Sequence, residues 1–145
     1  MMSGDPTRLW QLRSDDWCVA GEAALLAGVA ALGVRSVGVE RAARALARAA
    51  GVNQVRRVSI DRVVRVAEAV TAKLGTRCLT RSLVLQSILA RRGISSTVVL
   101  GAALERGRFR AHAWVEHDGQ VLSVQGRDGC LAIHRIDRAL AATPR

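Results

Sequence analysis

The sequence predicts an α+β fold, with helices in the first half of the chain and an antiparallel sheet in the second. Apolar residues recur every three or four positions from Ile60 to Leu74, which is the spacing of one buried helical face. Residues 96–102 form a β-branched run, which favours a strand. Further on, Asp118 and Gly119 separate two strand-like runs, and this pair is the strongest short-range signal for a β-hairpin.

Two helices are expected in the first third of the chain. The first begins after a Ser14 cap and runs to about Leu32, ending near Gly33. The second covers Val37–Ala50, because its alanine and arginine content favours helix and Gly51 can stop it.

Two more helices are predicted before the strands. The third helix has Ser59 as its cap and ends at Gly75. Its buried face consists of Ile60, Val63, Val64, Ala67, Val70 and Leu74. The fourth helix has Thr76 as its cap, contains Cys78, and ends at Gly93 after two arginines. Because it is apolar on most sides, it is expected to lie at the centre of the fold.

The segment after Gly93 is predicted to form the sheet. The expected strands are Ser96–Ala102, Arg108–His117, Val121–Gln125 and Cys130–His134, with a short helix over Ile136–Ala142. No repeat and no linker divides the 145 residues, so we expect a single domain spanning 1–145.

The net charge of +10 comes from 22 Lys and Arg residues against 12 Asp and Glu residues. The basic residues are spread along the chain with no block of five, so we interpret them as a solvated surface. An aromatic content of 3% also argues against recognition of bases by stacking. We therefore expect no nucleic-acid partner.

The three cysteines, at positions 18, 78 and 130, are too few and too scattered for a disulfide framework or a metal site. We expect no metal, no cofactor and a reducing cytoplasmic location. The apolar run Val19–Val34 is interrupted by Glu22 and is too short to span a bilayer, so it is interpreted as a helix packed on protein.

Cys78 is the candidate nucleophile. It is predicted to lie in the first turn of a helix between Arg77 and Arg81, where unpaired backbone N–H groups favour the thiolate. On position alone, a small buried hydrophobic residue is the commoner interpretation. Cys18 and Cys130 lack such a setting and are interpreted as structural.

His112 is the candidate base. In its alternating run it shares one strand face with Arg110, Trp114 and Glu116. With a two-residue hairpin, His112 faces Gln125 on the next strand, and the amide can reach the imidazole. The simpler interpretation is a histidine that satisfies a hydrogen bond within the sheet. The histidines at positions 117 and 134 are expected to face solvent.

Two motifs carry a resemblance to a known family. They are T-R-C-L-T-R-S-L-V-L-Q-S-I-L-A-R-R-G (76–93) and A-H-A-W-V-E-H-D-G (111–119). With the β-run between them, they resemble the transglutaminase-like cysteine peptidases that remove leader peptides in lasso-peptide biosynthesis. The resemblance implies a helical region over 1–58 and a transglutaminase/papain-like catalytic core over 59–145. It also implies that Cys78 attacks the scissile carbonyl, that His112 is its base, and that an aspartate on the next strand orients the histidine.

The sequence departs from that family at the aspartate. The expected position falls at Val124, where S-V-Q stands in place of a triplet with Asp. Gln125 is the substitute orienter that the hairpin register offers, Asp118 lies too far along the strand, and Asp128 requires a loop to fold back. The triad is therefore either assisted by an amide or incomplete.

The resemblance also implies partners. They are the leader region of a precursor peptide, a separate small protein that holds the leader, and the cyclase that forms the macrocycle. The alternative hypothesis is a catalytically inactive transglutaminase-like protein that binds a precursor peptide or partner protein. In either case Trp114 and Phe109 are expected to pack in the core.

Overall fold

The computed structural model describes residues 14–37, 41, 59–122 and 129–138. In this part of the chain three helices precede a four-stranded antiparallel sheet. The helices are α1 (Ser14–Val37), α3 (Ile60–Lys73) and α4 (Cys78–Arg91). The strands are β1 (Ser96–Glu105), β2 (Arg108–His117), β3 (Gln120–Val121) and β4 (Leu131–Arg138), in the spatial order β3-β2-β1-β4. The predicted α+β fold class is confirmed.

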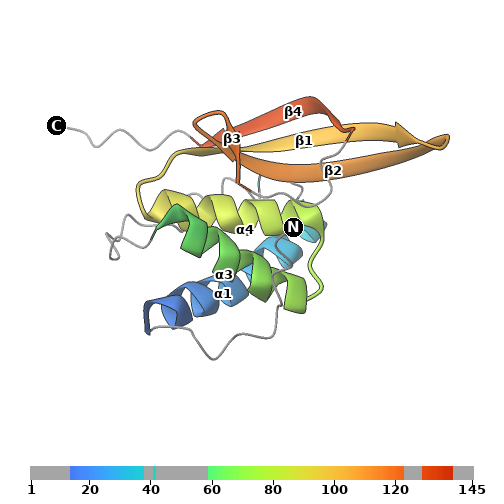
Figure 1. Cartoon of the computed structure of the whole chain (residues 1–145). Helices are drawn as coiled ribbons and strands as arrows, with labels where there is room; N and C mark the ends of the chain where they lie inside the picture. Colours follow the sequence, from blue (N-terminus) through green and yellow to red (C-terminus); the bar gives the residue numbers. More distant parts are fainter. Residues whose placement is uncertain (1–13, 38–40, 42–58, 123–128, 139–145) are drawn as a thin grey trace.

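Helix α4 forms the middle layer of the molecule. It contacts β1 and β2 on one side and packs against α1 and α3 on the other (Figure 1). Every residue from 82 to 90 is buried, as expected for a helix covered on both sides. The prediction that the fourth helix is central is therefore confirmed.

The hydrophobic core joins all three helices to the inner face of the sheet. It is built from small aliphatic side chains, of which Val and Leu each contribute about 1.5–3 kcal/mol when fully buried. Its members are Val19, Ala23, Leu26, Ala27, Ala30, Val63, Val64, Ala67, Leu83, Val84, Leu85, Ile88, Leu89, Val98 and Val115. The central residues of the face predicted for the third helix, Val63, Val64 and Ala67, thus lie in the core.

Ion pairs fix α1 against its two neighbouring helices. Asp16 is buried, and Arg62 donates to both of its carboxylate oxygens, at 2.5 and 2.6 Å. This hydrogen-bonded carboxylate raises the pKa of Arg62. Glu22 lies 2.9 Å from Arg91 Nε and accepts a hydrogen bond from Arg92 at 3.0 Å. Because α1 is tied to both α3 and α4, the position of α4 is set by polar as well as apolar contacts.

Gln86 ties α4 to the sheet. Its side chain is buried, and Nε2 donates to the carbonyl oxygens of Ser96 in β1 at 3.1 Å and Ile136 in β4 at 2.9 Å. A buried amide with two partners fixes the rotation of its helix, because turning the helix would break both hydrogen bonds of a buried side chain. This contact helps to set how the start of α4 lies relative to the strands.

Several helix boundaries differ from the predictions. Ser14, the predicted cap, is the first residue of α1, and α3 ends at Lys73. Helix α1 continues to Val37, because Gly33 inside a helix costs only about 1 kcal/mol. The N-cap of α4 is Arg77 and not Thr76, whose hydroxyl instead donates to the Thr71 carbonyl at the end of α3. Apart from its first residue and Arg41, which is helical, the helix predicted over 37–50 lies outside the described residues.

The second strand has its predicted bounds, whereas β1 and β4 extend beyond their predicted ends. The strand predicted over Val121–Gln125 is observed as Gln120–Val121, Leu122 is not part of it, and 123–125 lie outside the described residues. β1 continues to Glu105 and joins β2 through a tight turn at Arg106 and Gly107, whose φ angles are +50° and +76°. This turn carries no hairpin signal in the sequence, since arginine is not a residue typical of positive φ. The helix predicted from residue 136 is wrong for Ile136–Arg138, which form the end of β4, because Ile136 pairs with Val98 and packs on the core.

Candidate active site

Cys78 is the first residue of α4 and is half-buried. The helix start has no capping hydrogen bond from the Arg77 side chain and no acidic residue in its first turn. The first intrahelical bond runs from the Arg81 N–H to the Arg77 carbonyl, at 3.0 Å. Backbone N–H groups at such a helix start point along the axis and stabilise negative charge. The position therefore suits the oxyanion that forms when a sulfur nucleophile attacks a carbonyl.

The turn before Cys78 is held by side chains on both sides. The Thr76 hydroxyl donates to the Thr71 carbonyl at 2.8 Å, and Arg81 Nε donates to the Thr76 carbonyl at 3.0 Å. The turn also contains Gly75, whose φ of +63° suits glycine. These contacts fix the sulfur-bearing residue at a defined place at the end of the helix.

His112 lies in the middle of β2, directly opposite Gly101 of β1. Its imidazole stacks on the indole of Trp114, with ring centroids 6.4 Å apart and planes inclined by 19°. Nε2 of the imidazole is buried and has no hydrogen-bond partner. A buried polar atom without a partner is costly, and such atoms are often kept for a catalytic role. A free Nε2 is the atom that a general base needs.

Trp114 and Glu116 occupy the same strand face as His112, as predicted from alternation. Trp114 is only 2% exposed, which confirms its expected burial, and its Nε1 donates to Glu116 at 2.8 Å. Phe109 was expected in the core, but it lies near the tip of the β1–β2 hairpin and is 72% exposed. The hairpin extends past the helices that would have covered this ring (Figure 1).

The fold places the helix of Cys78 against the strand of His112. Helix α4 packs directly on β2, so the candidate nucleophile and the candidate base belong to neighbouring elements. Within the described residues no hydrogen bond joins the Cys78 sulfur to the imidazole, and the printed ring contact of His112 is with Trp114. Val115 packs in the core with α4, so the alternate residues His112, Trp114 and Glu116 lie on the face of the sheet that points away from this helix. The structure therefore places the candidate pair on neighbouring elements but does not bring the imidazole to the Cys78 sulfur.

A comparison with protein families matches residues 20–136 to the transglutaminase-like superfamily. The chain belongs to this superfamily. The matched segment includes Cys78 at the start of the central helix and His112 on the second strand. Neither the comparison with curated proteins nor that with solved structures gave a match.

Three residues were candidates for the third member of the triad, and the structure describes one of them, Asp118. Gln125 and Asp128 lie outside the described residues. Asp118 sits in the turn after β2, where its carboxylate is 3.4 Å from Nε2 of His117. The turn has positive φ at both Asp118 and Gly119, and His117 pairs with Gln120, as the predicted two-residue hairpin requires.

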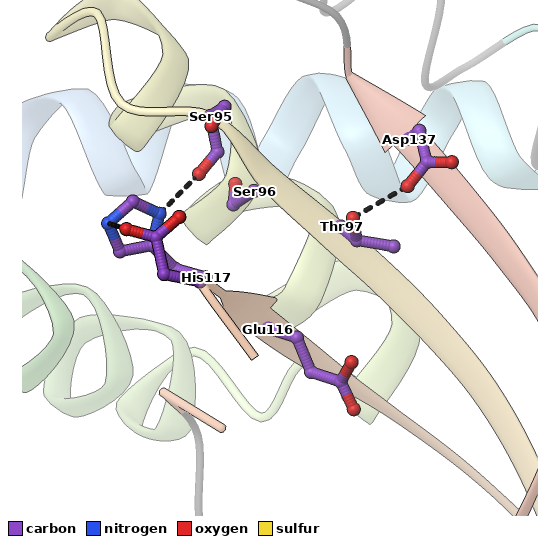
Figure 2. Close-up of a pocket in the computed structure, with 7 residues that line it drawn as sticks. Ser95, Ser96, Thr97, Glu116, His117 and Asp137 are labelled. Atoms are coloured by element: carbon purple, nitrogen blue, oxygen red, sulfur yellow. Dashed lines mark hydrogen bonds and ion pairs between the residues drawn. The ribbon is translucent and has the colours of Figure 1, made fainter. Parts of the chain in front are cut away.

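His117 does not face solvent as predicted. Its side chain is half-buried, and Nδ1 donates to the Ser95 carbonyl at 2.6 Å (Figure 2). It belongs to a shallow hollow of about 340 Å³ lined by Ser95, Ser96, Thr97, Glu116, His117, Asp118 and Asp137. The lining residues Ser95–Thr97 follow the carboxyl end of α4 along the chain, whereas Cys78 is the first residue at the other end of that helix. The hollow is therefore separate from the candidate active site.

The remaining predicted features concern cysteines, metals and membranes. All three cysteines fall in described parts of the chain, and no disulfide joins them. Over residues 14–37, 41, 59–122 and 129–138, His, Cys, Asp and Glu do not gather in threes as metal ligands would. Among the helices described, none combines the length and apolar character needed to cross a membrane.

Proposed function

We propose that this chain is a cysteine peptidase that removes the leader peptide from a ribosomally synthesised lasso-peptide precursor, in the cytoplasm. One observation carries the proposal. In a chain of the transglutaminase-like superfamily, Cys78 opens a helix packed on the strand of His112, whose Nε2 is buried and unpartnered. The resemblance of residues 76–93 and 111–119 to leader peptidases supplies the substrate class.

The proposed reaction has two steps. His112 Nε2 takes the proton of the Cys78 thiol, the sulfur attacks the carbonyl that ends the leader, and the backbone N–H of Cys78 stabilises the oxyanion. The amine of the core peptide leaves with the proton from His112, and the leader stays on Cys78 as a thioester. A water molecule, deprotonated by His112, then hydrolyses the thioester and regenerates the thiol. No cofactor takes part in this scheme.

The proposed partners follow from the same resemblance. A separate leader-binding protein presents the leader, and the cyclase receives the released core peptide. The direct test is an in vitro reaction of this protein with the precursor peptide encoded beside its gene, with and without the leader-binding protein. Mass spectrometry should find free leader and free core. An intact precursor in the presence of a folded enzyme and the leader-binding protein would rule out the proposal.

A second proposal is a catalytically inactive protein that binds the precursor or a partner. It is favoured by the lack, within the described residues, of a hydrogen bond that orients His112 or joins it to Cys78. The same experiment separates the two proposals. A binding protein co-elutes with the precursor on gel filtration and leaves it uncut, whereas a peptidase produces both fragments.

Gln125 is proposed as the residue that orients His112. Its amide oxygen would accept the Nδ1 proton and leave Nε2 as the base, as an amide does in papain-like enzymes. Gln125→Ala should lower the cleavage rate by about ten-fold, which is ~1.4 kcal/mol, without changing the thermal midpoint. Gln125→Glu should retain more activity, because a carboxylate accepts the same proton. Full activity of the alanine variant would remove Gln125 from the triad.

A further inference from the structure

We infer that Glu116 is a positioning residue for His112 and acts through the indole of Trp114. The inference rests on the proposed role of His112 as the catalytic base. Glu116 touches neither the reacting sulfur nor, in the proposed mechanism, the scissile bond. Its effect is to hold in place the Trp114 indole, on which the His112 imidazole stacks.

The carboxylate of Glu116 is fixed from two sides. Oε1 accepts the hydrogen bond from Trp114 Nε1 at 2.8 Å, and Oε2 accepts a hydrogen bond from Arg135 at 2.7 Å. Arg135 belongs to β4 and reaches across β1 to make this contact. The side chain of Glu116 is only 16% exposed, so water competes weakly for both oxygens. The acceptor of the indole N–H is therefore itself anchored to another strand.

The far end of the indole lies over a glycine. A Cβ added at Gly101 would stand 2.5 Å from Cζ3 and Cη2 of Trp114 and 2.9 Å from the Leu131 carbonyl oxygen, closer than real atoms approach. The ring thus fills the space that a side chain at Gly101 would occupy. The absence of a side chain there provides room for the six-membered ring, and the hydrogen bond at Nε1 sets how the ring is turned.

His112 depends on this arrangement for its own orientation. Gly101 is the residue directly opposite His112 in the β1–β2 register, so the indole that covers Gly101 lies beside the imidazole. The two rings are offset and nearly parallel, which is a favourable stacking geometry. Nε2 has no hydrogen bond to hold it, so the stack on Trp114 contributes to fixing the plane of the imidazole, beside the bond proposed from Nδ1 to Gln125. Turning the indole would therefore change the direction in which Nε2 points.

Two carboxylates on the sheet provide a matched comparison. Glu116→Ala removes the acceptor of the indole N–H. Asp137→Ala removes an acid from β4 that accepts a hydrogen bond from Thr97 at 2.6 Å. Both acids line the hollow at the end of the sheet. Of the two substitutions, only Glu116→Ala should disturb the active site. Glu116→Gln should rescue, because an amide oxygen still accepts the indole N–H.

The experiment combines nuclear magnetic resonance of the histidine ring with cleavage kinetics. The ring signals of the three histidines are assigned from single His→Gln variants. In Glu116→Ala the His112 ring signals should move as the stack on Trp114 loosens, and kcat should fall by about ten-fold with KM unchanged. Glu116→Gln should recover most of both properties, and Asp137→Ala should leave both near the values of the unmodified protein.

The two readouts distinguish failure of the inference from failure of the proposed function. His112 signals that stay in place in folded Glu116→Ala, or that move equally in Asp137→Ala, overturn the inference whatever the activity. If the His112 signals move as expected but the protein never cleaves the precursor, the positioning contact is supported. The proposed peptidase activity is then rejected. If Glu116→Ala does not fold, Arg135→Gln removes the hydrogen bond that the half-exposed Arg135 donates to Oε2, and a smaller shift of the same His112 signals is required.

Discussion

Cys78→Ala is expected to abolish cleavage of the precursor while leaving the fold intact. The rate should fall by at least about a thousand-fold, or ~4 kcal/mol of transition-state stabilisation, because no other group at the start of α4 can form the thioester. The side chain is half-buried, and the substitution removes only a sulfur atom. The free energy of unfolding should therefore change by less than about 1 kcal/mol. Mass spectrometry of the reaction and a thermal melt check the two parts.

Cys18→Ala is the matched control for this substitution. Cys18 is exposed on α1 and has no part in the proposed reaction, so the variant should keep full activity. A Cys78→Ala protein that still cuts the precursor would show that the nucleophile lies elsewhere in the chain.

His112→Gln is expected to lower the cleavage rate by about 10²–10⁴-fold, the usual contribution of a general acid–base group. Glutamine keeps a polar side chain on β2 but cannot exchange a proton at neutral pH. Binding of the leader should be unchanged, so kcat should carry the loss. Steady-state kinetics with the precursor measure both parameters.

His134→Gln serves as the comparison, because His134 is an exposed residue of β4. The kcat and KM of the His134→Gln variant should equal those of the unmodified protein. Equal losses in the two histidine variants would indicate a general effect on the sheet and not the loss of a base.

The fold could be predicted largely from local signals. The periodicity from Ile60 gives α3, and the Asp118 and Gly119 pair gives the hairpin that closes β2. Local signals predicted the wrong element or the wrong helix cap where a tertiary contact determines the local structure. Ile136 extends β4 because it packs against the core, and the Thr76 hydroxyl ends one helix in place of capping the next.

The candidate site was predictable only in its principal residues. Cys78 and His112 follow from position and from two short motifs, and alternation places Trp114 and Glu116 on the face of His112. The role of Gly101 depends on which ring of the neighbouring strand lies over it, and that of Arg135 on strand order. Neither is a local property of the sequence. A glycine inside a strand does indicate close approach of another group, so the sequence could have predicted that a side chain packs over Gly101.

Cys78 is proposed to be activated by its helix start and by His112, and the alkylation rate of each cysteine measures this activation. Iodoacetamide labelling, followed by mass spectrometry at each site, needs no substrate. Cys18 is exposed and Cys78 only half-buried, so accessibility alone predicts faster labelling of Cys18. The account predicts that Cys78 reacts at least about ten-fold faster than Cys18 or Cys130 at neutral pH, and that His112→Gln slows Cys78 alone. Faster labelling of Cys18, together with a Cys78 labelling rate that is the same in His112→Gln as in the unmodified protein, would contradict the activation of Cys78.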